Sequence, residues 1–373
     1  MKKSLLALAV LGAYAGVASA QSSVTLYGTV DLNGRYVKQD VTSGESKRWS
    51  LGRDGINSSQ LGFRGIEDLG GGLKAGFLLL SSVGADSGDI GAGQSATGSG
   101  KFWTRRATVS LFSNAGELRL GRDYTPTFWN NTIFDAFGTN GLGDSTGGVI
   151  QMPATTFVRA DNSVGYHLPA NIGGFYGQFM MAASEAGQAG QSSNNGRYLG
   201  GRVGFAAGPF DVAFAYAQQR TAGGVANTDQ DTWNIGGSWD FGFLKLLGYY
   251  DHDKRDNTGK EDRWSISTVI PLGQGEIHLG YDESKLDLDQ ALVCVTPPGG
   301  GPCPGVSNKQ KKFAATYQYN LSKRTAMYGT IALLDNGDQA RASISPQGTG
   351  AVTGVSEFGG KSKGFELGIR HFF

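Results

Sequence analysis

The sequence is poor in several features that mark common classes of protein. It has only 2 Cys and 10 Pro in 373 residues, and charged residues make up 17 %. With 11 % aromatic residues, this composition excludes collagen, a coiled coil and a disordered tail. The formal net charge is +1 and the basic residues are spread along the chain. A nucleic-acid partner would therefore find no basic stripe to bind.

Long hydrophobic runs are also missing. No window holds the roughly 18 uninterrupted apolar residues that a membrane-spanning helix needs, so the chain is not a helical membrane protein. What is abundant is glycine, with 60 residues, more than twice its average share of about 7 %. A folded chain rich in strands remains.

Residues 1–20 differ from everything that follows. Lys2 and Lys3 precede a short apolar run, which ends at Ala18-Ser19-Ala20. A basic start, a short apolar core and an A-x-A end are typical of a secretory signal peptide, so we expect cleavage before Gln21. The mature chain, 21–373, is then exported and forms one domain.

Apolar and polar residues alternate with period two along the whole mature chain, which predicts strands. The predicted strands are near 23–38, 58–69, 73–85, 102–113, 116–124, 162–169, 174–184, 198–208, 210–220, 231–242, 244–256, 262–273, 275–287, 310–322, 325–336 and 361–373. Long polar connections are expected near 39–57, 86–101, 125–161, 185–197, 221–230, 257–261, 288–309 and 337–360. Tight turns alternate with these connections, which is typical of an up-and-down antiparallel barrel.

The two faces of the predicted strands show which side of the barrel is wet. Leu367 and Ile369 share one face of the last strand, and Glu366 and Arg370 share the other. A barrel of about sixteen strands with one apolar and one charged face suits a lipid bilayer outside and a water-filled lumen inside. Since only helices and closed barrels satisfy every backbone group in lipid, we predict an all-β, 16-stranded antiparallel transmembrane β-barrel.

Four stretches resemble a known family. They are SSVTLYGTVDLNGRY at the start of the mature chain, SSQLGFRGIEDLGGGLKAGF at 58–77, LRLGRDYTP at 118–126 and GFELGIRHFF at the end. They are similar to the general diffusion porins of Gram-negative outer membranes, β-proteobacterial type. The resemblance implies a homotrimer in the outer membrane, with short periplasmic turns, long external loops and a third loop folded into the lumen. It also implies as partners the membrane lipid with its lipopolysaccharide, the barrel assembly machinery, and small hydrophilic solutes and ions.

The third long connection carries several aromatic residues, among them Phe128, Trp129 and Phe134. Folding inward against the barrel wall would remove them from water. Asp135 and Asp144 then become candidates for the acidic side of a pore constriction. The alternative is an external lid that is stabilised by its own aromatic residues.

Cations on the inward face of the first five strands are the candidates for the side of the pore constriction that faces the acidic loop. By parity these are Arg35, Arg64, Arg106 and Arg119, with Lys74 on the next strand, while the parity of Arg53, Arg105 and Arg122 stays open. Such a wall facing an acidic loop would create a transverse field and set ion preference. Because the arginines outnumber the two acids, we predict a weak anion preference. For any single arginine, pairing with a nearby carboxylate without effect on flux is the alternative.

Two further features concern the ends and loops of the barrel. Cys294 and Cys303 bracket a Pro- and Gly-rich connection, and in an exported protein they predict a loop disulfide, with free thiols or a two-thiol metal site as alternatives. Phe373 has the outward parity of Leu367 and closes the chain. A terminal aromatic residue resembles the assembly signal of outer-membrane barrels.

The sequence contains no complete signature of catalysis or of cofactor binding. The four His residues form no metal-ligand spacing, and the glycine-rich stretches lack the strand-then-helix setting of a phosphate or dinucleotide site. We therefore predict no enzyme activity, no cofactor and no metal. The chain is predicted to be a passive channel, the alternatives being a solute-selective channel with a dedicated site, an adhesin and an outer-membrane hydrolase.

Overall fold

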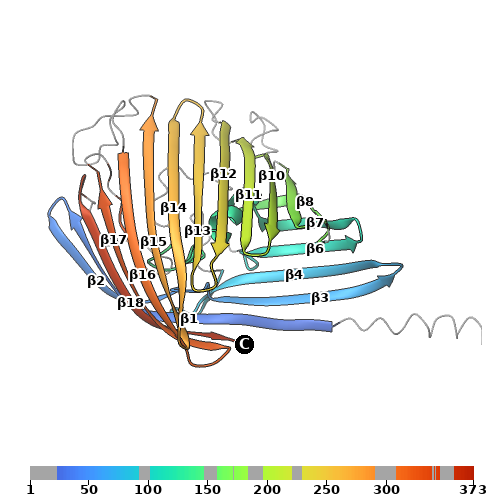
Figure 1. Ribbon diagram of the computed structural model, residues 1–373, viewed down its shortest axis with the longest axis horizontal. Helices are drawn as coiled ribbons and strands as arrows, with labels where there is room; N and C mark the ends of the chain where they lie inside the picture. Colours follow the sequence, from blue (N-terminus) through green and yellow to red (C-terminus); the bar gives the residue numbers. More distant parts are fainter. Residues whose placement is uncertain are drawn as a thin grey trace, which may run out of the picture.

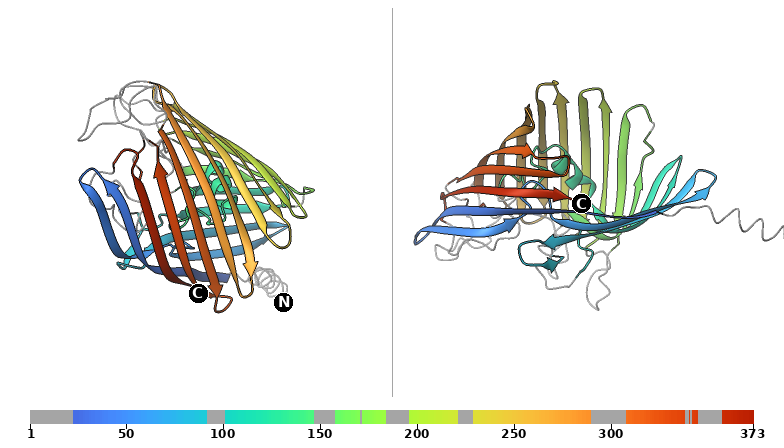
Figure 2. Two further views of the ribbon diagram at one scale, coloured as in Figure 1. Left: turned by 60° about the vertical axis from the view of Figure 1, so that its left-hand side comes forward. Right: turned by 90° about the horizontal axis from the view of Figure 1, so that it is seen from below.

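The computed structural model describes residues 23–91, 101–146, 158–170, 172–183, 196–220, 229–289, 308–337, 340, 342–344 and 357–373. The predicted signal peptide at 1–20, Cys294 and Cys303 lie outside these residues. The strands wrap around into a closed barrel, with one short helix lying inside it (Figures 1 and 2). Among the described residues, no helix is long and apolar enough to span a membrane.

The first part of the chain forms strands up to β9 and one helix. They are β1 (Ser23–Val41), β2 (Gly44–Arg53), β3 (Gln60–Gly70), β4 (Leu73–Gly84), β5 (Asp89–Ile90), β6 (Arg106–Ser113), β7 (Gly116–Tyr124), α2 (Pro126–Ile133), β8 (Arg159–His167) and β9 (Phe175–Ala182). The second part forms β10 (Tyr198–Ala207), β11 (Phe210–Arg220), β12 (Asp229–Asp240), β13 (Lys245–Arg255), β14 (Gly259–Leu272), β15 (Gly275–Leu288), β16 (Asn308–Asn320), β17 (Thr325–Asn336) and β18 (Lys361–Phe372).

Sixteen barrel strands result from these segments, as predicted. Both β2 and β3 pair with β1, so they are two halves of one barrel strand, interrupted at 54–59. Among the described residues, the two-residue β5 pairs with the end of β4. Antiparallel pairing of β1 with β18, from Thr29↔Phe372 to Gln39↔Ser362, closes the ring. Within the described parts of the chain, each barrel strand pairs with a neighbour on both sides, which is the condition for a sheet in lipid.

Two expected long connections are shorter than predicted. The stretch near 39–57 contains the end of β1 and all of β2, which form a hairpin around Thr42-Ser43. Its polar sequence still forms strands because β1 continues to pair on its other side with β18, and because Tyr36 packs on Trp49 across the hairpin with ring centroids 4.9 Å apart. The expected connection at 257–261 is also a tight turn, between Arg255 and Gly259.

The two faces of the barrel have the predicted polarity. On β18 the outward residues Leu367 and Ile369 are 66 % and 49 % exposed, whereas the inward Glu366 is fully buried. On β12 the outward Ile235 is exposed and the inward Asn234 is buried among lumen groups. An apolar outer face and a polar inner face are the arrangement of a transmembrane barrel.

Candidate pore constriction

The third connection enters the barrel as helix α2, followed by a compact turn. The described part, residues 125–146, is called loop 3 below. Thr125 caps the helix, since its Oγ1 accepts a hydrogen bond from the N–H of Phe128 at 3.4 Å, and Pro126 opens the first turn. The helix contacts β9, β10, β11 and β12 (Figure 1). The inward folding predicted from the aromatic residues is therefore present in the structure.

Packing against the wall fixes the end of α2. Phe134 is fully buried beside Ala213 and Tyr249. Its ring lies directly on Gly236 of β12, where a side-chain Cβ would collide with it. Glycine at this inward position therefore makes room for the loop aromatic.

Hydrogen bonds to wall residues hold the helix in place. The amide of Asn130 donates to Oδ1 of Asn234 at 2.9 Å, and the amide of Asn131 donates to Oδ2 of Asp251 at 3.0 Å. Arg263 in turn donates to Oδ1 of Asp251 at 2.6 Å. These groups are buried and linked by hydrogen bonds, so α2 is joined to a polar network on β12, β13 and β14.

Asp135 organises the turn that follows. Its carboxylate accepts hydrogen bonds from the N–H groups of Phe137 and Thr139 and from the hydroxyl of Ser145, each at 2.9 Å. Burial raises the pKa of the Asp135 carboxyl above its usual range, and the neighbouring Asp144 acts in the same direction. Asp135 is thus largely buried inside loop 3, at the edge of a cavity that it helps to line.

The end of loop 3 docks on an inward bulge of the wall, residues 54–59. Asp31 of β1 holds this bulge by accepting hydrogen bonds from the N–H groups of Ile56 at 2.9 Å and Asn57 at 2.8 Å. The hydroxyl of Ser58 then donates to Oδ1 of Asn140 at 2.8 Å. The loop is therefore attached to the wall at both of its ends, and not only through the helix.

The arginines predicted to form the cationic wall are largely neutralised by neighbours. Arg35 is fully buried and pairs with Glu366 at 2.7 Å. Arg106 and Arg119 share Asp123, at 2.7 and 2.6 Å. Arg119 also binds Glu117 at 2.7 Å.

Two other predicted cations lie away from loop 3. Arg64 is exposed and lies over the ring of Tyr27, with 5.4 Å from its guanidinium carbon to the ring centroid. Lys74 is exposed on β4 opposite Asp68, next to the tight turn that joins β3 and β4. The structure therefore does not gather the five predicted cations into one patch facing the loop.

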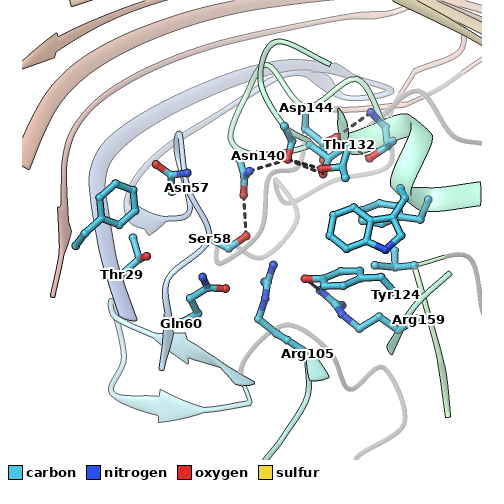
Figure 3. A pocket seen from close by; sticks show the side chains of 17 residues that line it. Thr29, Asn57, Ser58, Gln60, Arg105, Tyr124, Thr132, Asn140, Asp144 and Arg159 are labelled. Carbon is cyan, nitrogen blue, oxygen red and sulfur yellow. Dashed lines mark hydrogen bonds between the residues drawn. The ribbon is translucent and has the colours of Figure 1, made fainter. Parts of the chain in front are cut away.

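A cavity of about 440 Å³ lies between loop 3, the inward bulge and the start of β8; we call it the first cavity (Figure 3). Arg105 and Arg159 approach it on either side of Tyr124 (Figure 3). Arg159 donates to the Tyr124 hydroxyl at 2.9 Å and covers its ring at 4.5 Å. Asp144 lines the same cavity, and its carboxylate accepts hydrogen bonds from Thr146.

Among the described residues, no carboxylate lies within 4 Å of the Arg105 guanidinium, whereas the two other arginines of open parity are paired. Arg53 binds Asp86 at 2.9 Å, and Arg122 binds Asp161 at 2.6 Å. Sequence reasoning left Arg105 undecided and did not select Arg159. Arg105 directly precedes β6 and Arg159 begins β8, the two strands that pair with β7, from which the third connection leaves. This placement was the signal that could have selected both arginines.

Phe373 lies where the chain closes. Its N–H and C=O exchange hydrogen bonds with Gly28, each at 3.1 Å, and its ring covers the Cα of that glycine. The side chain is 44 % exposed on the outer face. The last residue therefore belongs to the seam between the first and last strands.

A closed sixteen-stranded barrel with a polar lumen, narrowed by an inserted loop, defines an outer-membrane porin. The chain belongs to the Gram-negative porin family, whose model matches residues 7–339.

Similar proteins agree with this assignment. Outer membrane porin protein 32 of Delftia acidovorans is 40 % identical over 385 residues, covering 100 % of both chains. An outer membrane porin of Bordetella pertussis is 30 % identical, covering 88 % of this chain and 93 % of its own. Among solved structures, the anion-selective porin from Comamonas acidovorans has a TM-score of 0.76 at 36 % identity, covering 95 % of this chain and all of its own.

The protein is thus a multi-pass β-barrel of the outer membrane that forms a water-filled channel for passive diffusion of small hydrophilic solutes and ions.

Proposed function

We propose that this channel prefers anions and that Arg105 and Arg159 set the preference at the first cavity. The carrying observation is that two guanidinium groups flank Tyr124 on one side of the cavity, while Asp144 is the acidic residue lining it. Fixed positive charge at the narrowest part of a pore raises the local concentration of anions. The similar protein from Comamonas acidovorans is described as anion-selective, which supports the same preference here.

The charges predicted from parity contribute less in this proposal because most are compensated. Glu366 neutralises Arg35, and Asp123 with Glu117 balances Arg106 and Arg119. Asp135 is buried and bound by backbone N–H groups. The transverse field then runs from Arg105 and Arg159 towards Asp144, across the first cavity.

Removing these two charges tests the proposal. A unit charge about 5 Å from a permeating ion in water changes its energy by about 0.8 kcal/mol, equivalent to about fourfold in local concentration. Because the charge acts with opposite sign on the two ions, we expect R105Q and R159Q each to lower the chloride-to-potassium permeability ratio by up to about sixteenfold. Reversal potentials in planar bilayers measure this ratio. K74Q is the matched control, because Lys74 is exposed and lines no part of the first cavity. Unchanged ratios in both arginine variants would refute the assignment.

We further propose that the channel works as a homotrimer, that lipopolysaccharide surrounds its external rim and that the barrel assembly machinery inserts it. Family membership supports the trimer, and exposed Val24, Leu26 and Val30 provide an apolar outer surface on β1. Residues 1–20 are proposed to be removed on export, which N-terminal sequencing of the outer-membrane protein would show as a start at Gln21.

A Cys294–Cys303 disulfide stays a prediction, to be checked by mass spectrometry after alkylation without reduction.

A further inference from the structure

A second cavity of about 380 Å³ lies on the other side of the loop 3 contact with the wall. Asn57, Gly138 and Asn140 line both cavities, and the Ser58–Asn140 hydrogen bond joins loop and wall where the two meet. At about 30 Å³ for each water molecule, the second cavity holds roughly a dozen waters. It is therefore large enough for a small organic solute.

One side of the second cavity carries a positive charge from β18. Arg370 is 5 % exposed, and its Nε has no hydrogen-bond partner among the described residues. Its guanidinium lies 3.9 Å from the ring centroid of Phe372. Within the described part of the chain, no carboxylate comes within 4 Å of it. A buried, underused guanidinium that lines a cavity is suited to receive a carboxylate.

The opposite side carries a negative charge from β15. Glu276 is about one-third exposed, and His278 contacts one of its oxygens at 3.1 Å. His278 is itself held by the loop, since its Nδ1 lies 2.7 Å from the backbone oxygen of Ala136. This contact fixes the histidine, while the exposed part of the Glu276 carboxylate is available to a cation.

Polar side chains form the floor between the two charges. In the sheet register, Gln318 of β16 lies opposite Glu276 and Thr316 lies opposite His278. Strand β17 follows, where Ala326 lies opposite Arg370. Three strand spacings separate β15 from β18, so their backbones are about 14 Å apart. The long side chains of Glu276 and Arg370 reduce this distance to the size of a small molecule.

From these observations we propose that the second cavity is a transient binding site for zwitterionic α-amino acids. The carboxylate of the solute binds Arg370, its ammonium group binds Glu276, and Thr316 and Gln318 provide hydrogen bonds between them. A simple anion would bind less well because Glu276 repels it, in contrast to the first cavity with its two arginines. The site goes beyond the proposed anion preference, and it would give the channel a preference among solutes of no net charge.

Current recordings with L-glutamine as the probe test this site. In wild-type single channels we expect glutamine to cause brief interruptions of the current or additional current noise. This effect should saturate as the glutamine concentration rises. E276Q should raise the half-saturating glutamine concentration about tenfold, equivalent to about 1.4 kcal/mol, and should not weaken the effect of acetate. R370Q should weaken both probes. R64Q is the matched control, because Arg64 is a lumen arginine that lines neither cavity, and it should change neither.

Three outcomes would overturn the proposal. The first is the absence of any saturable effect of glutamine. The second is an effect of acetate alone that E276Q strengthens, which would indicate an anion site. The third is loss of the glutamine effect in R105Q but not in R370Q, which would place the site in the first cavity. R370K, which keeps the charge, together with a heat-modifiability assay, separates loss of binding from faulty assembly. The reversal potentials that test the anion preference are independent of all three.

Discussion

At the scale of single residues, a lumen arginine contributes to selectivity only if its neighbours leave its charge uncompensated. Arg119 reaches both Glu117 on its own strand and Asp123, four residues along. Parity predicts that such residues face the lumen, but it does not show which carboxylates come within reach. Which carboxylates a lumen arginine reaches depends on the positions of the side chains in the folded sheet. For this reason Arg106 and Arg119 could be selected from the sequence, whereas their ion pairs could not.

Removing the shared acid should release this compensated charge. In D123N, both Arg106 and Arg119 lose their common carboxylate while the side-chain oxygen next to the Tyr124 N–H is retained. We expect the chloride-to-potassium permeability ratio to rise by up to about sixteenfold, by the same Coulomb estimate of about 0.8 kcal/mol for each ion. Reversal potentials measure the change, and D68N at the exposed β3–β4 turn is the control. A ratio equal to that of D68N would contradict the compensation.

At the scale of elements, period two predicted the barrel strands well because every one of them separates lipid from water. Strand β2 was missed because its sequence is polar and its order depends on pairing with β1. The inward bulge at 54–59 was missed for a related reason, since Asp31 forms it from a different strand. The aromatic content of the third connection predicted that it folds inward, but its docking residues, such as Ser58, could not be predicted without the tertiary structure.

Loop 3 is positioned by close packing of Phe134 on Gly236 of β12, and this contact can be tested. In G236V the new side chain would occupy the place of the Phe134 ring, and such overpacking costs about 1–3 kcal/mol. We expect the loop to move off the wall, which changes the single-channel conductance and lowers the temperature at which the folded protein unfolds in a heat-modifiability assay. G237V is the neighbouring control, because residue 237 faces outward. Equal behaviour of the two variants would show that Phe134 does not fix the loop.

At the scale of the whole molecule, closure of the ring makes the channel possible. The first and last strands pair over eleven residues, and Phe373 adds two hydrogen bonds to Gly28 at the seam. An unclosed ring would leave backbone N–H and C=O groups in hydrocarbon, each at a cost of several kcal/mol. The terminal residue lies on the outer face, away from the lumen charges.

Deletion of Phe373 should therefore affect assembly and not conduction. We expect less heat-modifiable protein in the outer membrane, because the seam loses two hydrogen bonds and the aromatic cover of Gly28. Channels that do form should show the wild-type reversal potential. A variant that assembled at the wild-type level but had altered ion selectivity would contradict both the outward position and the closing role.

The most direct measurement of the central claim is the zero-current potential of the purified wild-type channel in a planar bilayer under a tenfold KCl gradient. A water-filled, anion-preferring pore predicts a potential with the sign of the chloride equilibrium, between zero and the single-ion limit of about 59 mV. It also predicts that this potential moves towards zero when Arg105 and Arg159 are both replaced by Gln. A potential with the sign of the potassium equilibrium in the wild-type channel would contradict the account.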